Sequence, residues 1–354
     1  MIRLALQFDV EKTAWLRYGT QLALKLDMSF PTNHQTHTAS EITIGEIREA
    51  ATRIKGYIRR TPLLSCSPVN DAPKGAELLQ LKLECLQVTG SFKARGAVNK
   101  LKTLGADATA RGIITASGGN HGLAVAYAGR LARVPTTIYL PTTVSEEKIH
   151  KFRRWEARLV IEGASWDDSN RAALAMADRD GLAYFHPFAD PVVIEGQGTI
   201  ALEILEDAPD IDTIVVAIGG GGLISGIAVA AKAIRPNIKI VGVEPVGAAT
   251  VYKSIKAGHR IELAKIETAA GPLGARASEQ LNLDLVKQHV SEIFLVTDDE
   301  MRHAARWLWF ELGIAAELAG AAAVASILSG HYTPAEGERV CAVVCGSGTD
   351  GIEV

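Results

Sequence analysis

Short β-prone runs alternate with helical patterns along most of this sequence. The runs that we expect to form strands span residues 113–115, 136–140, 213–218, 238–243, 293–296 and 340–344. Helical patterns occupy residues 123–131, 146–155, 223–233, 298–312 and 317–328. This alternation is typical of the α/β class, in which parallel sheets carry helices on both faces. Ligands of such folds bind at the carboxyl ends of the strands, where the glycine-rich turns of this chain lie.

Composition sets limits on the function. With 354 residues, 47% of them hydrophobic, the chain can form one large domain or two smaller ones around a cleft. The net charge of -3 and the lack of a long basic run give nucleic acid and anionic membranes no electrostatic basis as partners. Four scattered cysteines, without a CxxC or HExxH motif, predict reduced thiols and no zinc site, so we expect a cytoplasmic protein.

The two ends of the sequence differ from the part between them. Residues 1–40 lack a signal-peptide pattern and include a polar stretch without periodicity, so we expect a loosely held extension. Met28 is a second candidate translation start. No apolar run is long enough to span a bilayer. Only a short tail follows the last predicted strand, and we expect no appended regulatory domain.

The segment 89–97, TGSFKARGA, runs from a loop into a predicted helix and contains one lysine, Lys93. Most lysines are simply exposed charges. Here small residues follow the lysine, and the Phe92 ring can shield it. Desolvation lowers the pKa of a lysine and frees its amine to form a Schiff base, so Lys93 is a candidate nucleophile.

Two glycine-rich turns each lead from a strand into a helix. In Ser117-Gly118-Gly119-Asn120-His121-Gly122, backbone N–H groups at a helix start can hold a carboxylate, and a plain tight turn is the alternative. Residues 219–223, GGGGL, fit neither GxGxxG nor the P-loop pattern. Four consecutive glycines cost conformational entropy, which favours close approach of the backbone to a phosphate over a purely structural turn.

A fourth motif, Cys345-Gly346-Ser347, follows the last predicted strand. Taken alone, it is as typical of a buried structural cysteine before a turn as of a binding site. In this order, however, the motifs closely resemble those of the serine/threonine dehydratase group of fold-type-II pyridoxal-phosphate enzymes, which includes serine racemase. Residues 195–199, EGQGT, resemble a further hallmark of the dehydratases. The resemblance covers residues 42–354.

The resemblance implies a tryptophan synthase β-like fold of two parallel-sheet, three-layer domains with pyridoxal 5'-phosphate between them. The large domain is expected to comprise residues 41–88 and 181–354, and the small domain residues 89–180. The small domain is expected to close on the substrate. The resemblance and the alanine-rich helices near the carboxyl terminus both suggest a homodimer.

The resemblance also implies roles for individual residues. Lys93 is expected to carry the cofactor and to transfer protons. The residues expected to bind the cofactor beside it are Phe92 at the ring, Asn120 at the 3'-oxygen, Gly219, Gly220, Gly221, Gly222 and Leu223 at the phosphate, and Cys345 at the pyridine nitrogen, with Ser347 as its substitute. The residues expected to hold the substrate carboxylate are Ser117, Gly119, Asn120 and His121.

The implied reaction is α,β-elimination from a β-hydroxy-α-amino acid, which yields a 2-oxo acid and ammonia. Racemases of this group use a serine where this chain has Gly118, so we expect little racemisation. Leu123 and the pair Glu317-Leu318 depart from the usual residues near the substrate, which leaves open whether the substrate is threonine-like, serine-like or larger. A β-replacement synthase, a racemase and a catalytically silent binding protein remain alternatives, whereas the glycine spacing excludes a nicotinamide dehydrogenase.

Some members of the group bind a divalent cation through a glutamate, a backbone carbonyl and an aspartate. Glu244 and Ala248 match the first two ligands, but Thr250 stands in the place of the aspartate. Because a hard cation prefers several oxygen ligands that include carboxylates, a cation at Glu244 and Ala248 is doubtful. An ion pair of Glu244 at the surface or at an interface is the alternative.

Overall fold

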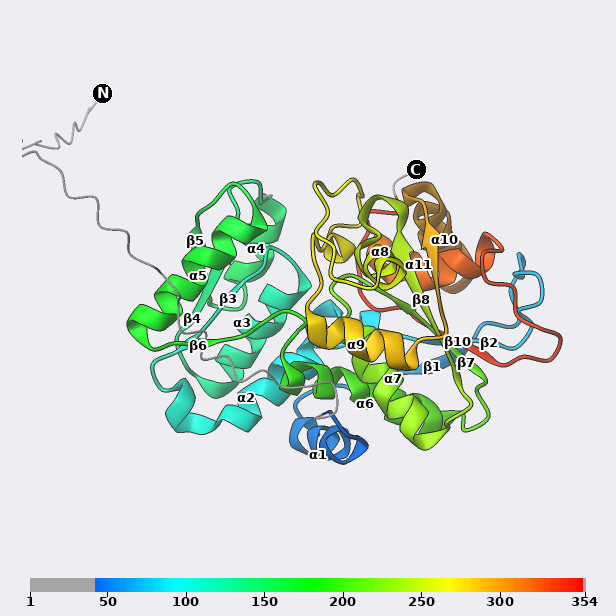
Figure 1. Cartoon of the computed structure of the whole chain (residues 1–354), viewed down its shortest axis with the longest axis horizontal. Coiled ribbons are helices and arrows are strands. Elements are labelled where there is room, and N and C mark those ends of the chain that lie inside the picture. Colours follow the sequence, from blue (N-terminus) through cyan, green and yellow to red (C-terminus); the bar gives the residue numbers. More distant parts are fainter. Residues whose placement is uncertain (1–41, 145, 353–354) are drawn as a thin grey trace, which may run out of the picture. The chain divides into compact units, whose positions relative to one another are not determined.

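The computed structural model describes residues 42–144 and 146–352. The expected extension over residues 1–40, and Met28 within it, lie outside this part. The described part contains two sheets, each flanked by helices, as Figure 1 shows. The predicted α/β class is therefore confirmed.

The larger sheet has six strands, and all but the first run parallel. In spatial order they are β1 (Leu63–Ser65), β2 (Leu79–Lys82), β10 (Val340–Val343), β7 (Thr213–Ala217), β8 (Lys239–Pro245) and β9 (Glu292–Val296). The last strand of the chain thus lies between an early strand and a middle one. This order brings the segments that follow β10 and β7 to the same edge of the sheet.

The smaller sheet has four strands, all parallel. In spatial order they are β5 (Arg158–Ile161), β4 (Thr136–Leu140), β3 (Ile113–Ala116) and β6 (Ala183–Tyr184). Every residue of β3 and β4 is buried, as expected for strands covered on both faces. The helices next to this sheet are α2 (Lys93–Thr109), α3 (Asn120–Ala132), α4 (Glu146–Arg153) and α5 (Trp166–Asp180).

The remaining helices accompany the six-stranded sheet. They are α1 (Ile44–Ile54), α6 (Pro191–Asp207), α7 (Gly222–Ile234), α8 (Thr250–Ala257), α9 (Gln280–His289), α10 (Asp298–Leu312) and α11 (Leu318–Leu328). Thr43 and Thr297 form capping boxes at the starts of α1 and α10, where the threonine side chain and a glutamate satisfy free backbone N–H groups.

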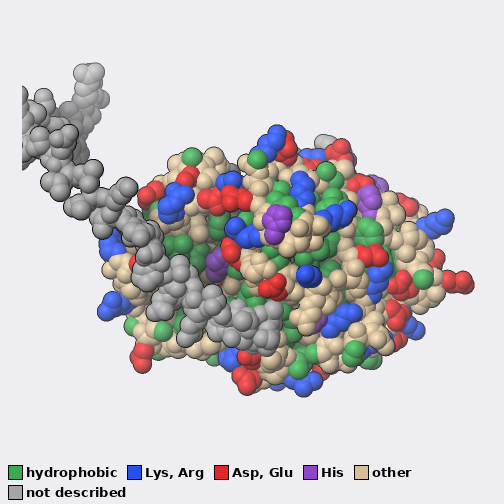
Figure 2. Space-filling model, in the orientation of Figure 1, with side chains coloured by type: hydrophobic (Ala, Val, Ile, Leu, Met, Phe, Trp, Pro, Cys, Tyr) green, Lys and Arg blue, Asp and Glu red, His purple; other side chains and the backbone are tan. Residues whose placement is uncertain are grey.

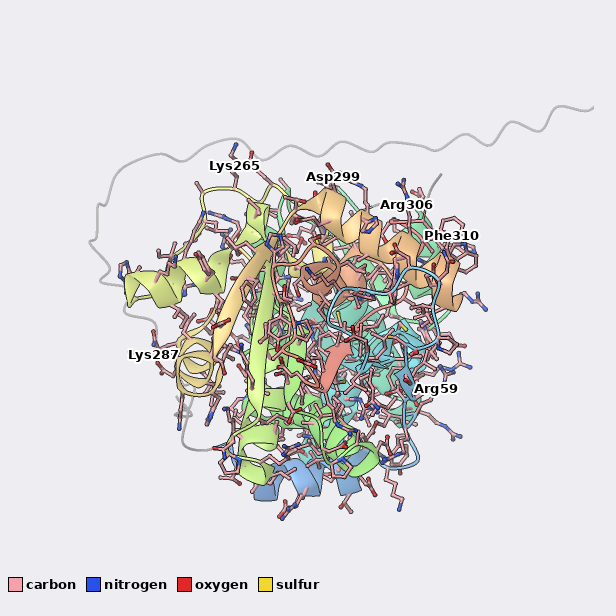
Figure 3. All side chains as sticks on the ribbon, turned by 90° about the vertical axis from the view of Figure 1, so that its right-hand side faces the viewer. Arg59, Lys265, Lys287, Asp299, Arg306 and Phe310 are labelled. Carbon is pink, nitrogen blue, oxygen red and sulfur yellow. The ribbon has the colours of Figure 1, made fainter. Side chains whose placement is uncertain are left out.

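The alanine-rich helix α11 is buried along its whole length up to Ile327, so it is part of the core of the large sheet. It therefore gives no support to a dimer interface, contrary to the sequence-based expectation. Helix α10 carries two neighbouring exposed aromatic side chains, Trp309 at 43% and Phe310 at 68% exposure. Figure 3 shows Phe310 projecting outward from that helix.

All six predicted strands and all five predicted helices are present, with ends that shift by three residues or fewer. The boundaries predicted for the two domains stay a prediction; the one at residue 180 lies just before β6, which pairs with β3 in the smaller sheet. No helix within residues 42–144 and 146–352 is both long and apolar enough to cross a membrane. Acidic and basic side chains are interspersed over the face shown in Figure 2.

Candidate active site

Lys93 is the first residue of α2, directly after Phe92, whose amide bonds to the segment that follows β10. Its ammonium donates a hydrogen bond of 2.6 Å to the carbonyl of Pro187 and lies 5.1 Å from the centre of the Phe92 ring. Part of the side chain is accessible, yet burial around the nitrogen lowers the pKa of Lys93 to about 8 from its ordinary 10.5. A substantial fraction of this amine is therefore neutral, and nucleophilic, near neutral pH.

The carboxyl-terminal motif lies alongside the segment that leads into Lys93. The Phe92 amide donates to the Cys345 carbonyl at 3.2 Å, and Ser91 and Gly346 form an antiparallel bridge. The Cys345 thiol donates to the Ala319 carbonyl at 3.3 Å. Burial raises the pKa of this thiol, so it stays neutral. The structure thus brings Cys345 next to Phe92 and Lys93, as the sequence predicted.

The asparagine loop, residues 117–122, joins β3 to α3 and places the start of that helix at the site. Gly119 is the N-cap residue, and its amide donates to the Ser117 hydroxyl at 3.3 Å. The first free N–H groups of α3 are those of Asn120 and its neighbours, and together with the helix dipole they favour an anion. A substrate carboxylate fits this charge.

Asn120 is held by Glu317, which the sequence placed near the substrate but did not predict as the partner of Asn120. Its side-chain amide donates to Glu317 Oε1 at 2.6 Å, and Glu317 is the N-cap residue of α11. Both groups lie against the α-carbon of Gly346, because a β-carbon there would contact Glu317 Oε1 and would lie 3.2 Å from Asn120 Nδ2. Glu317 therefore joins the asparagine loop to the carboxyl-terminal motif.

His121 is buried and neutral. Its Nε2 lies 3.0 Å from the Phe185 carbonyl, and burial lowers the pKa of His121 to about 3 from its ordinary 6.5, with the nearby Lys93 lowering it further. A neutral ring that donates through Nε2 has an acceptor at Nδ1. That Nδ1 is buried without a hydrogen-bond partner among the described residues. His121 thus contributes an unsatisfied acceptor close to Lys93.

The glycine loop, residues 219–222, joins β7 to α7. A β-carbon at Gly220 would collide with the Phe188 ring, and one at Gly222 would lie 2.5 Å from the Phe188 carbonyl oxygen. Gly221 has a φ of +93°, which favours glycine. Ser278 fixes the loop from the other side through a 3.0 Å bond from its hydroxyl to the Gly220 carbonyl. Phe188 and Ser278 were not predicted from the sequence.

These residues fit pyridoxal phosphate. Lys93 offers an amine to the aldehyde, and the free N–H groups at the start of α7 suit a phosphate. The hydroxyl of Ser225, in the first turn of α7, is buried without a hydrogen-bond partner among the described residues, as expected of a group that awaits a ligand. The neutral Cys345 thiol suits an uncharged pyridine nitrogen.

A buried ion cluster holds the start of α2 in place. Arg95 pairs with Glu84 at 2.7 Å and with Glu203 at 2.7 Å, and Lys82 pairs with Glu203 at 2.6 Å. Two cations and two carboxylates compensate each other, which buried charges require. The cluster thereby ties the turn that carries Lys93 to β2 and α6.

The EGQGT segment has a packing function in the structure. A β-carbon at Gly196 would lie 2.7 Å from the α-carbon of Gly96, and one at Gly226 would lie 2.6 Å from the Gly198 amide nitrogen. Helix α6 therefore touches α2 and α7 backbone to backbone. Because α2 starts at Lys93 and α7 starts at Gly222, these two crossings set the distance between the amine and the glycine loop.

The predicted cation ligand Glu244 lies at the carboxyl end of β8, among backbone N–H groups. Glu244 is fully buried, and its two oxygens accept hydrogen bonds from the amides of Val251 at 2.9 Å and Tyr252 at 2.7 Å. The burial of Glu244 contradicts the alternative of an ion pair at the surface. Among the described residues there is no group of three or more His, Cys, Asp or Glu side chains that could hold a metal.

Comparisons with known proteins agree with this geometry. Residues 54–346 match the family model described as "Pyridoxal-phosphate dependent enzyme". The chain is 38% identical to the L-threonine ammonia-lyase of Thermotoga maritima over 87% of this chain and 76% of that protein. It is 36% identical to the catabolic L-threonine dehydratase of Staphylococcus aureus over 88% of this chain and 91% of that protein.

Among solved structures, that of maize serine racemase has a TM-score of 0.81 and 35% identity, and the match covers 86% of this chain and 93% of that one. The predicted fold type II is therefore confirmed. The chain belongs to the family of pyridoxal-phosphate-dependent enzymes, and within it to the threonine dehydratase group.

Proposed function

We propose that Lys93 carries pyridoxal phosphate and that the chain removes the β-hydroxyl of a threonine-like or serine-like amino acid, which yields a 2-oxo acid and ammonia. The observation that carries the proposal is the Lys93 amine, whose pKa is lowered to about 8, between the asparagine loop and Cys345. The relatives named for threonine ammonia-lyase and dehydratase activity support it.

When bound, pyridoxal phosphate supplies an electron sink that acidifies the proton on the substrate α-carbon. The chain supplies the base. Once the substrate amine has replaced it, the Lys93 Nζ is free to accept that proton, because burial keeps its pKa near neutrality. The N–H groups at the start of α7 are proposed to bind the phosphate, and Asn120, oriented by Glu317, to bond the 3'-oxygen.

Cys345 determines which outcome is favoured. Its thiol is neutral and donates to the Ala319 carbonyl, so it provides no negative charge to keep a pyridine nitrogen protonated. A weaker electron sink disfavours a long-lived carbanion and favours prompt loss of a β-leaving group. This supports elimination over transamination.

The substrate is proposed to bind at the start of α3. Ser117 and the backbone of Gly119, Asn120 and His121 offer hydrogen-bond donors to the carboxylate, assisted by the helix dipole. Gly118 has no side chain that could return a proton to the opposite face of the substrate, so we propose elimination with little racemisation. Leu123, in the first turn of α3, departs from the usual residue near the substrate, so the proposal includes substrates whose β-substituent is larger than a methyl group.

We also propose the broader setting of the enzyme. Residues 89–180 would form the small domain, and residues 41–88 and 181–354 the large one; strands β3, β4 and β5 support this division, whereas β6 pairs with β3 from just beyond the boundary. A homodimer is proposed with Trp309 and Phe310 of α10 in the interface, since both are exposed. A cytoplasmic location is supported by the four cysteines, all buried and free.

The test is a substitution at Lys93 in the purified holoenzyme. Lys93→Ala should abolish the absorbance at roughly 410 nm of a lysine-bound cofactor and lower the release of 2-oxo acid from L-threonine or L-serine by roughly a thousandfold or more. Lys102→Ala, on the exposed side of the same helix, is the matched control and should change neither.

Borohydride reduction fixes the cofactor to the lysine that carries it, and peptide mapping then identifies that lysine. The modified residue should be Lys93. Modification of another lysine would refute the proposal. Product that forms only when sulfide is added would favour a β-replacement synthase. A colourless protein after reconstitution would favour a silent binding protein.

A further inference from the structure

The carboxyl end of β8 carries the chain's one match to the family's cation glutamate, Glu244. This carboxylate is fully buried and makes no ion pair with another described residue. We propose that Glu244, Thr250 and Ala275 form a hydrogen-bonded anchor, which holds the start of helix α8 in place without a bound cation. The fold and the activity of this chain are then independent of divalent cations.

Glu244 caps helix α8. The N-cap residue of that helix is Ala249, which has no side-chain acceptor for the free N–H groups of the first turn. The two Glu244 oxygens take its place and accept from the amides of Val251 and Tyr252 at 2.9 and 2.7 Å. A carboxylate at a helix start is also favoured by the helix dipole. The buried group is thus satisfied by backbone donors alone.

Thr250 completes the anchor where the family pattern has an aspartate. Its hydroxyl donates to the Ala275 carbonyl at 2.5 Å, so the side chain is a donor and not a second anionic ligand. Ser278 lies three residues after Ala275, and its hydroxyl donates to the Gly220 carbonyl at 3.0 Å. The anchor therefore connects α8 to the segment that supports the glycine loop.

This donor set is unsuitable for a hard cation. Mg²⁺ and Ca²⁺ require several oxygen ligands, and their sites usually include more than one carboxylate. Here one carboxylate is present, and both of its oxygens face backbone N–H groups, whose positive partial charges repel a cation. The Ala248 carbonyl would add only one further oxygen ligand, which is too few for such a cation.

The first test is the thermal midpoint of the holoenzyme, which reports on the anchor independently of any reaction. Dialysis against EDTA, and then addition of Mg²⁺, Ca²⁺ or Mn²⁺, should shift the midpoint by less than about 1 °C, and ammonia release should stay unchanged. A midpoint that falls on chelation and recovers with a cation would overturn the proposal.

The second test removes the cap. Glu244→Gln turns one acceptor oxygen into an N–H group that faces a backbone donor, so the midpoint should fall by about 3–8 °C, and no cation should restore it. Glu267→Gln is the matched control, since that side chain is 60% exposed and should shift the midpoint by less than about 1 °C. Equal midpoints for the two variants would refute the role of Glu244.

The third test restores the missing carboxylate. Thr250→Asp breaks the bond to Ala275 and places two acids side by side, so the midpoint should fall in EDTA and rise again with Mn²⁺ or Ca²⁺. A variant whose midpoint ignores both ions would overturn the role assigned to Thr250.

Discussion

The asparagine loop and the glycine loop are both glycine-rich turns from a parallel strand into a helix, yet the protein packs them differently. In the glycine loop, the Phe188 ring and carbonyl occupy the space where side chains of Gly220 and Gly222 would lie. In the asparagine loop, a β-carbon at Gly119 would meet nothing within 4 Å. One at Gly118 would lie 3.8 Å from Pro141 and Val144, an ordinary contact.

This difference separates two reasons for using glycine. The glycine loop is shaped by the protein, and its form is set before a ligand arrives. The asparagine loop is open at Gly118 and Gly119, at the start of α3, where the substrate is proposed to bind, whereas a β-carbon at Gly122 would collide with the Ser117 carbonyl oxygen. Substitutions in the first loop should therefore act on cofactor binding, whereas substitutions in the second should act on what happens to the substrate.

The largest effect is expected from Gly220→Ala. Overpacking against the Phe188 ring costs about 1–3 kcal/mol in similar cases, which corresponds to cofactor binding weakened by up to about a hundredfold. Fluorescence titration of the apoenzyme with pyridoxal phosphate measures this. Gly119→Ala should bind within about threefold of the unsubstituted chain, because the added methyl group enters open space. Equal losses for the two variants would contradict the comparison.

The next effect concerns Glu317, on the open side of the site. Hydrogen bonds to charged groups contribute about 1.5–3 kcal/mol, so Glu317→Ala should lower kcat by about tenfold to a hundredfold, because Asn120 loses its partner. Glu317→Gln keeps an acceptor and should recover part of that loss. Cofactor affinity should fall less in both variants than in Gly220→Ala, since the glycine loop proposed to bind the phosphate is untouched. If Glu317→Ala lost its cofactor as readily as Gly220→Ala, Glu317 would support cofactor binding in the same way as the glycine loop.

The sequence indicated the local parts of this site. Strand runs followed by glycines predicted the asparagine loop and the glycine loop as ligand sites, since ligands of parallel sheets bind at the carboxyl ends of the strands, whereas the roles of Lys93 and Cys345 at the cofactor were implied by the resemblance. Glu317 was noticed as a departure from the usual Glu-Pro pair but not as the partner of Asn120, which is 197 residues away along the chain. Phe188 lies in a segment without a motif, so no local pattern connected it to the glycine loop.

The supporting structure was also beyond local patterns. The pairs of Arg95 with Glu203 and of Lys82 with Glu203 join residues 108 and 121 positions apart. Arg95 was visible two residues after Lys93, but a charge in a helix is usually solvated. The glycines of EGQGT are typical of a helix that another backbone approaches closely. Only the structure shows that the approaching backbone is that of α2, where it crosses α6.

Lys93 donates a hydrogen bond to the carbonyl of Pro187, the neighbour of the Phe188 residue that packs against the glycine loop. Only the neutral amine attacks an aldehyde, so reconstitution of the apoenzyme should speed up as the pH rises through about 8, where burial places the pKa of Lys93. The rate should rise about tenfold between pH 7 and 9 and then level off. Stopped-flow absorbance measures it, with Nα-acetyl-lysine amide as the control for the cofactor's own titration. A rate that keeps climbing toward pH 10.5 would show an ordinary lysine.

The smallest and most specific effect is expected from Gly118→Ser in the open loop. The serine fits, since its β-carbon would lie 3.8 Å from the nearest atoms, and its hydroxyl could return a proton to the face opposite Lys93. D-serine should then form from L-serine at roughly 1% of the elimination rate, measured by chiral chromatography. Gly118→Ala fills the same space without a hydroxyl and should form none. D-serine from the alanine variant, or fast racemisation by the unsubstituted chain, would mean that the proton comes from elsewhere and that the open loop does not control the outcome.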